Sequence, residues 1–323
     1  MTLKVLTWSD YIDPEVVAEF EAATGIGLNF VHFETSEGRD DLLITSDGAG
    51  YDLILTNGYA LQLYVQRGWL APVGSSEVPN LRHIDPRWLN GAPDSKSYGV
   101  PYFWGTLGIA YRADLYEKPL TRWLDLLDPP AELQGKIIML KDTRDLIGMA
   151  LLASGHSANS AEPEALAQAR ELLLRQKPHV KAYSYVSMNE ESALVTGEIW
   201  AAQMYNGDVL MLQEYNPHIR YVVPEEGSNL WVDYWAVAAS SANKSAAFRF
   251  IDFMNEPEVA ARVAEYVHYA TPNQAAARLL PPEYHADPVI NPPDDVLRRS
   301  EQYILLPPRS MRAWNALFSE IIH

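Results

Sequence analysis

The stretch Leu230-Trp231-Val232-Asp233-Tyr234-Trp235 predicts a β-strand, because β-branched and aromatic residues dominate it and Gly227-Ser228-Asn229 marks its start. Side chains alternate between the two faces of a strand, so Trp231, Asp233 and Trp235 share one face. An indole and a carboxylate on one face suit a cation with an apolar stem, since the ring attracts the charge and the acid neutralises it. The pattern fits equally well a sheet edge with Asp233 in solvent.

The first part of the chain alternates strands with helices. We expect strands at 3–7, 28–33 and 51–55, and helices at 14–25, at 39–45 and after Gly58. This alternation is typical of a mostly parallel sheet covered by helices, in which ligands bind beyond the carboxyl ends of the strands. Five polar or aromatic residues follow those ends: Trp8, Asp10, Tyr11, Asn57 and Tyr59.

A second set of elements follows residues 75–98, whose content of Pro, Asp, Asn and Ser predicts a surface connection. A strand at 136–140 leads into a helix that begins near Asp142 and Asp145. The helix dipole alone favours acids at a helix start, so these two residues either cap the helix or bind a ligand. Further helices are expected at 161–175, 189–196, 245–255, 257–267, 296–303 and 310–322, and a further strand at 199–204.

The bulk composition predicts a globular protein of two lobes. The chain has 323 residues, more than the ~100–200 residues of one ordinary domain. Its net charge of −17 argues against nucleic acid and against an anionic membrane surface as partners. The absence of cysteine excludes disulfides, thiolate metal sites and cysteine nucleophiles. Met1 leads directly into a strand, so the protein is either cytosolic or has lost an export signal.

The sequence lacks the signatures of common enzyme and cofactor sites. It has no phosphate-binding glycine loop and no dinucleotide fingerprint. Gly155-His156-Ser157-Ala158-Asn159 lacks the second glycine of a nucleophile elbow, and no two histidines have metal-ligand spacing. We therefore expect no catalytic residue, no cofactor and no metal. A glycosidase stays open on the residues alone, because paired acids among aromatic rings also suit a sugar.

Several segments of the chain resemble the spermidine/putrescine-binding proteins of bacterial ABC importers. They are Trp8-Ser9-Asp10-Tyr11-Ile12, 20–26, 51–53, 101–106, 224–227 and Thr271-Pro272-Asn273, which keep the family order and cover essentially the whole chain. The resemblance implies an α/β fold of the two-lobed periplasmic-binding-protein type (type II), with a helix-covered mixed sheet in each lobe and a ligand cleft between the lobes. Residues 1–107 with 232–277 would form one lobe, and residues 108–231 with 278–323 the other.

The resemblance also implies a set of ligand-binding residues, with aromatic rings beside the methylenes of a polyamine and acids on its ammonium groups. Asn57 stands where the family often has serine, Asp145 where glutamate is usual, and Tyr205 where tryptophan is common, so the preferred polyamine stays open. The implied ligand-binding residues are Trp8, Ser9, Asp10, Tyr11, Asn57, Tyr59, Asp142, Asp145, Tyr205, Asp208, Trp231, Asp233, Tyr269, Glu301 and Gln302.

The function implied by the resemblance is capture of putrescine, spermidine or both. The protein would be a periplasmic monomer that delivers the polyamine to the membrane permease subunits of an ABC importer, with hinge closure coupled to the ligand. The same fold also serves a second hypothesis, a periplasmic sensor that passes the bound state to a signalling protein. The glycosidase is the third.

Overall fold

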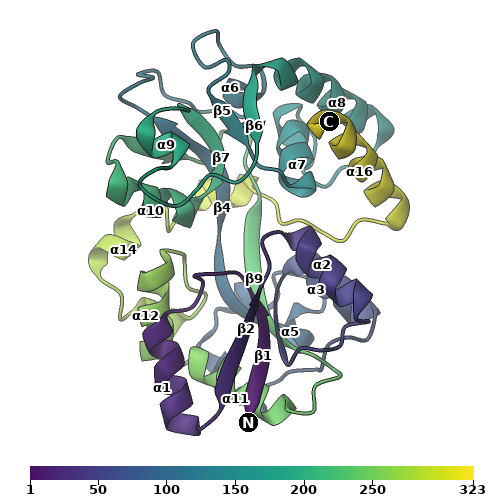
Figure 1. Cartoon of the computed structure of the whole chain (residues 1–323), viewed down its shortest axis with the longest axis vertical. Coiled ribbons are helices and arrows are strands. Elements are labelled where there is room, and N and C mark those ends of the chain that lie inside the picture. The colour runs from purple at the N-terminus through teal and green to yellow at the C-terminus, as the bar shows by residue number, and fades with distance from the viewer. The chain divides into compact units, whose positions relative to one another are not determined.

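The computed structural model describes residues 1–323, which form two compact units (Figure 1). Unit 1 comprises residues 1–104 with 231–286, and unit 2 comprises residues 105–230 with 287–323. The chain therefore passes between the units three times, and strand β4 (Val100–Arg112) contains the first passage. The lobe bounds expected from the resemblance stay a prediction.

Unit 1 is built on a mixed sheet with the strand order β2-β1-β3-β9-β4. Strand β1 (Thr2–Thr7) is parallel to both β2 (Gly27–His32) and β3 (Leu53–Asn57), as the alternation of elements predicts. Strand β9 (Leu230–Val237) is antiparallel to β3, so its first residues lie beside the carboxyl end of β3. The carboxyl end of β3 and the first residues of β9 therefore lie together at one end of the sheet.

Helices cover both faces of this sheet. Figure 1 shows α1 (Pro14–Thr24) and α12 (Pro257–Val267) on one side of β1 and β2, and α2 (Ser36–Thr45) and α3 (Gly58–Gln66) on the other. The first helix begins and ends as its sequence predicts: Asp13 caps it by accepting from the Glu15 N–H at 2.8 Å, and Gly25 ends it with a φ of 68°. Helix α11 (Lys244–Met254) completes the cover, with Phe250 packed against Trp235 of β9.

The prediction of a surface connection at residues 75–98 is only partly right, because many of these residues are exposed but the segment is helical in places and its apolar side chains are buried. This segment forms three short helices: η1 (Pro79–His83), α4 (Pro86–Leu89) and α5 (Ser95–Tyr98). Its scattered apolar residues are buried, Trp88 among them, whose ring stacks on Trp104 at 4.4 Å. Proline and aspartate there begin helices of a single turn, which a composition argument mistakes for loop. Two further short helices of unit 1, α13 (Gln274–Ala277) and α14 (Pro282–Ala286), were not predicted.

Unit 2 repeats the plan with the strand order β8-β4-β7-β5-β6. Its strands are β5 (Ile137–Met139), β6 (Val180–Tyr183), β7 (Ala201–Tyr205), β8 (Ile219–Val222) and the second part of β4. Figure 1 shows α7 (Thr143–Ala153), α8 (Pro163–Gln176) and α16 (Pro308–Ile322) grouped together, and they pack on one another. The remaining helices are α6 (Leu124–Leu127), η2 (Lys177–His179), α9 (Ala193–Thr196), α10 (Asn206–Tyr215) and α15 (Asp294–Arg299).

No helix in either unit combines the length and the apolar character that crossing a membrane requires.

Candidate functional site

Asp233 lies in the ladder between β9 and β3, directly opposite Asn57. Strand β9 has β3 on one side and β4 on the other, and Asp233 is only 9% exposed. The sheet-edge alternative is therefore excluded. The predicted alternation of faces is confirmed. Asp233 and Trp235 lie on one face, where Tyr11 donates a hydrogen bond to Asp233 and the Tyr102 ring packs against both Tyr11 and Trp235. Tyr234 points to the other face, where its hydroxyl donates to the carbonyl of Trp88.

The buried position changes the acidity of Asp233. Loss of water raises the pKa of its carboxyl to about 7, although the charge of Arg39 and a hydrogen bond from the Tyr11 hydroxyl act in the opposite direction. Near neutral pH the carboxyl therefore lies between its neutral and its ionised form. A cation that entered this site would stabilise the ionised form and supply the interaction that water no longer provides.

Three aromatic residues form a connected group with this carboxyl, and we call Asp233, Tyr11, Trp231 and Tyr269 the Asp233 cluster. The rings of Tyr11 and Tyr269 meet edge to face at 5.9 Å between centroids, and those of Trp231 and Tyr269 at 4.8 Å. The Tyr102 hydroxyl donates to the carbonyl of Tyr11 at 2.7 Å and fixes the turn after β1. Burial raises the pKa of Tyr11 well above its usual value, so its hydroxyl stays a neutral donor. Such rings suit an alkyl chain that carries a positive charge.

Two other predicted residues lie at the end of β3. Asn57 caps α3, because its Oδ1 accepts from the Ala60 N–H at 3.1 Å, while its Nδ2 donates to Ser36 Oγ at 3.5 Å. Tyr59 is half-buried in the first turn of α3 and contributes to the electrostatic surroundings of Arg39. The structure therefore brings both residues to the strand ends where they were expected.

The turn between β1 and α1 carries the predicted residues Trp8, Ser9 and Asp10. The ring of Trp8 packs on Phe33 at 4.3 Å and is half-buried. Ser9 and Asp10 are exposed, and Asp10 has a φ of 54°, in the left-handed region that aspartate tolerates better than most residues. Both side chains are accessible, and no hydrogen bond joins either of them to Asp233.

In unit 2 the predicted acids meet at the start of α7. Asp142 caps the helix, because its Oδ1 accepts from the N–H groups of Arg144 at 2.8 Å and Asp145 at 2.9 Å. The capping interpretation of Asp142 is therefore confirmed, and it leaves a role in ligand binding open. Both carboxyls lie at the N-terminus of α7, the positive end of the helix dipole.

The carboxylate of Asp145 accepts hydrogen bonds from two tyrosines, and we call Asp142, Asp145, Tyr205 and Tyr303 the Asp145 cluster. The Tyr205 hydroxyl donates to Oδ2 at 2.5 Å, and the Tyr303 hydroxyl donates to Oδ1 at 2.9 Å. Asn229 Nδ2 lies 3.4 Å from the same Oδ1. Burial first, then the charge of Asp145, raises the pKa of both tyrosines well above the usual value. These hydroxyls therefore stay protonated and keep donating to the acid.

For the three remaining predicted residues of unit 2, the structure shows other partners than Asp145. The Glu301 carboxylate accepts from Ser157 Oγ at 2.5 Å and from Asn159 Nδ2 at 3.3 Å, in the turn that follows α7. Gln302 is half-buried, and its carbonyl accepts from the same Asn159 side chain. Asp208 stands in the first turn of α10, where its charge raises the pKa of Tyr221 further after burial has raised it. Their assignment to a ligand stays a prediction.

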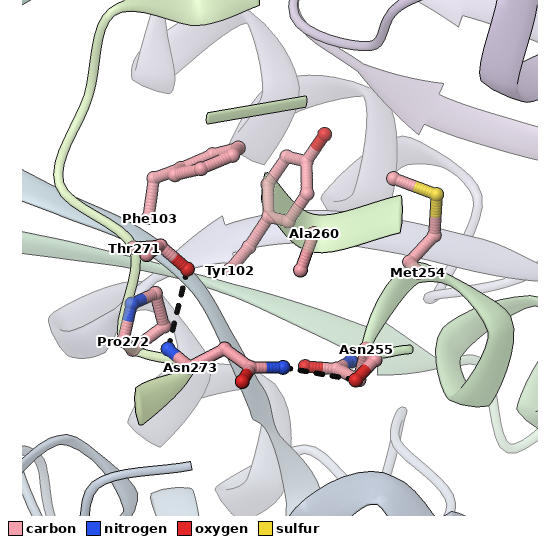
Figure 2. Close-up of a pocket in the computed structure, with 8 residues that line it drawn as sticks. All are labelled: Tyr102, Phe103, Met254, Asn255, Ala260, Thr271, Pro272 and Asn273. Carbon is pink, nitrogen blue, oxygen red and sulfur yellow. Dashed lines mark hydrogen bonds between the residues drawn. The ribbon is translucent and has the colours of Figure 1, made fainter. Parts of the chain in front are cut away.

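A small pocket in unit 1 lies outside the predicted residues (Figure 2). Thr271 and Asn273 line it together with Asn255, and none of the fifteen predicted residues does. Figure 2 shows Asn273 hydrogen-bonded to both: its backbone N–H donates to Thr271 Oγ1 at 3.2 Å and its Nδ2 to the Asn255 carbonyl at 2.9 Å. Asn273 also caps α13. Asn273 thus connects the segment that follows Tyr269 to the end of α11 and to the start of α13.

Sequence reasoning missed two side chains that act on these clusters, Arg39 through its charge and Tyr303 through a hydrogen bond. Arg39 lies in the buried stripe of α2 with Ser36 and Leu43, at helical spacing, which is the signal that would have found it. Tyr303 follows two residues that were predicted, Glu301 and Gln302, and it is the residue of this segment that reaches Asp145. Nothing in the pattern of the irregular segment before α16 distinguishes these three neighbours.

The chain is similar to known proteins over nearly its full length. The family model described as bacterial extracellular solute-binding protein matches residues 15–292. A spermidine/putrescine-binding periplasmic protein of Escherichia coli (strain K12) is 31% identical, over 93% of this chain and 86% of that protein. A norspermidine sensor of Vibrio cholerae is 33% identical, over 92% of this chain and 82% of that protein. A solved spermidine/putrescine ABC transporter substrate-binding protein from Streptococcus pneumoniae has a TM-score of 0.86 and 30% identity, with 99% of this chain and 98% of that chain covered.

Proposed function

Because the chain belongs to the bacterial extracellular solute-binding protein family, we propose that it binds a polyamine in the periplasm and delivers it to an ABC importer. Its fold is the two-lobed α/β fold of periplasmic binding proteins that the sequence led us to expect. The relatives described above are binding proteins and a sensor, so the glycosidase hypothesis is abandoned.

The Asp233 cluster is the observation that carries the proposal. It combines a buried carboxyl with the rings of Tyr11, Trp231 and Tyr269, and it has no second acid that would make it a catalytic pair. A cation over an aromatic face gains about 0.5–2 kcal/mol, and a hydrogen bond to a charged group about 1.5–3 kcal/mol. A micromolar complex needs about 8 kcal/mol in total, so a few such contacts suffice.

A polyamine has at least two separated ammonium groups, and we assign one of them to each unit. The Asp233 cluster takes one ammonium group, and the Asp145 cluster takes the other through Asp142 and Asp145. Trp8, Ser9, Asp10, Asn57, Tyr59, Asp208, Glu301 and Gln302 remain candidates for further contacts with the ligand. This assignment requires no cofactor and no metal.

A sensor that passes the bound state to a signalling protein is the second candidate function. The similarity to the norspermidine sensor of Vibrio cholerae supports it. Both candidates require the same bound polyamine, and they differ in the partner that recognises it. Co-purification of the polyamine-loaded protein with importer permease subunits would favour transport, and co-purification with a signalling membrane protein would favour sensing.

Ligand binding is tested by calorimetry and thermal shift with putrescine, cadaverine, spermidine, norspermidine, spermine and agmatine, and with sugars and amino acids as controls. The proposal predicts binding of one or two amines at micromolar or lower concentration, and no response to the sugars. Size-exclusion chromatography with light scattering tests the expected monomer. The absence of a response to every amine would overturn the proposed ligand class.

A further inference from the structure

Arg39 is a buried arginine of unit 1, the unit that carries the candidate cation-binding acid Asp233. Its side chain is 1% exposed and belongs to the buried face of α2. A fixed cation near a cation-binding site opposes the ligand, because like charges repel more strongly in a protein interior than in water. The charge of Arg39 acts on the Asp233 carboxyl, so its burial in this unit needs an explanation beyond packing.

Two polar groups hold the Arg39 guanidinium in place. Nε donates to the Tyr64 hydroxyl at 2.9 Å and to Asp40 Oδ1 at 3.1 Å, and Nη2 donates to the same Oδ1 at 2.9 Å. The Tyr64 hydroxyl also donates to Asp40, so the three groups form one network. The Asp40 side chain is 22% exposed, whereas that of Arg39 is buried, so water screens the acid more than the guanidinium. Part of the positive charge therefore remains uncompensated towards the protein interior.

Helix α2 brings this charge to the end of the sheet where Asp233 lies. Ser36, one turn before Arg39, accepts a hydrogen bond from Asn57, which is the ladder partner of Asp233. The guanidinium carbon of Arg39 also lies 5.5 Å from the ring centre of Phe33, the ring on which Trp8 packs. Arg39 is thus linked to two predicted ligand-binding residues, to Asn57 through Ser36 of the same helix and to Trp8 through Phe33.

We propose that Arg39 is a resident cation that competes with a ligand's ammonium group for electrostatic interaction with the Asp233 carboxylate. It thereby limits the affinity of polyamine binding and sets its pH range. The inference rests on the proposed function, because it assumes that an ammonium group binds at Asp233. In the ligand-free protein the guanidinium supports the ionised carboxylate. In the complex the same charge repels the incoming ammonium group.

The other groups that act on Asp233 carry no charge in the relevant pH range. They are the hydroxyls of Tyr11 in the turn after β1, Tyr102 on β4 and Tyr234 on β9, each with a pKa raised above the usual value chiefly by burial. Arg39 lowers the pKa of Asp233 against the effect of burial. Loss of the guanidinium should therefore make the carboxyl harder to ionise.

The decisive experiment measures the affinity of wild type and Arg39→Met for the amine that wild type binds best, at about pH 8.5 and about pH 5.5. At the higher pH the variant should bind about fivefold more tightly or better, because the repulsion is gone. At the lower pH the gain should disappear, since a proton then competes more strongly for Asp233. A purely structural Arg39 predicts weaker binding of the variant at both pH values, and that result would overturn the inference.

Asp40→Asn gives the opposite test and does not require removal of the arginine. Without Asp40 the guanidinium is less compensated, so binding at about pH 8.5 should weaken, while binding should persist to lower pH than in wild type. This variant keeps the inference testable if Arg39→Met does not fold. Arg67→Met is the matched control, because Arg67 is exposed in the same unit and water screens its charge.

The outcomes separate this inference from the proposed function. Tight amine binding by wild type, with Arg39→Met and Asp40→Asn both weaker at about pH 8.5, would overturn the role of Arg39 and leave the proposed function intact. Failure of wild type to bind any amine would overturn both. An equal gain for Arg67→Met would show that net charge alone is responsible, and would also overturn the inference.

Discussion

The two acidic clusters of this protein solve the problem of a buried carboxyl in different ways. Asp145 in unit 2 receives hydrogen bonds from two tyrosine hydroxyls, at 2.5 and 2.9 Å, and sits at the start of a helix. Asp233 in unit 1 has a hydrogen bond from Tyr11, and burial raises its pKa to about 7. Asp145 thus has several hydrogen-bond donors of its own, whereas a cation would supply an interaction that Asp233 lacks.

The difference implies a division of labour between the two acids. A carboxylate that already has hydrogen-bond donors gains less from a ligand and is better suited to fix the position of its neighbours. A poorly solvated carboxylate gains more, because the ligand replaces water that burial has removed. We therefore expect Asp145 to contribute chiefly to stability and orientation, and Asp233 to contribute chiefly to ligand affinity.

The largest expected effect is on the pH dependence of stability without ligand. The raised pKa of Asp233 means that the folded protein holds a proton that the unfolded chain has lost between about pH 4 and pH 7. Its contribution to the free energy of unfolding is full below that window and is lost as the pH rises through it. Wild type should therefore lose up to a few kcal/mol relative to Asp233→Asn across the window, at about 1.4 kcal/mol per unit of pKa shift.

Urea denaturation of wild type and Asp233→Asn at intervals from about pH 4 to pH 8 measures this difference directly. The variant shares every other titrating group with wild type, so the difference between the two stability curves isolates the titration of Asp233. If the two stability curves run parallel, Asp233 is ionised throughout, and the contrast with Asp145 disappears.

The next largest effect concerns Asp145→Asn, which leaves two tyrosine hydroxyls with a poorer acceptor. We expect a loss of about 2 kcal/mol in the free energy of unfolding at neutral pH, the usual cost of leaving buried polar groups unsatisfied. Asp233→Asn should be neutral or stabilising under the same conditions, because it removes a poorly solvated charge. A change of the same sign in both variants would contradict the division of labour.

A smaller effect is expected for Trp231→Ala, which removes the ring that packs edge to face with Tyr269. Loss of an apolar and cation-attracting wall should weaken polyamine binding about tenfold, or about 1.4 kcal/mol, with the fold intact. Trp200→Ala is a matched control on unit 2, since its ring lies under Lys136 and outside both clusters. Equal losses of affinity in the two variants would remove Trp231 from the site.

Several features of this site could be predicted from the sequence because local rules decide them. The period of two in Leu230–Val237 places Trp231 and Asp233 on one face, and the Asp142 cap follows from an acid before a helix. The burial of Asp233 depends on β9 lying between β3 and β4, which no local pattern records. The roles of Arg39 and Tyr303 depend on contacts with Tyr64 and Asp145 that only the folded chain brings about.

The role of Asp233 is tested most directly by the calorimetric affinity of wild type and Asp233→Asn for the preferred polyamine at about pH 8, where the carboxyl is ionised. We expect wild type to bind at micromolar or lower concentration, and the variant to bind about tenfold more weakly or worse, because a charge-assisted contact has been lost. Equal affinity of the two proteins would contradict the claim that Asp233 receives an ammonium group of the ligand.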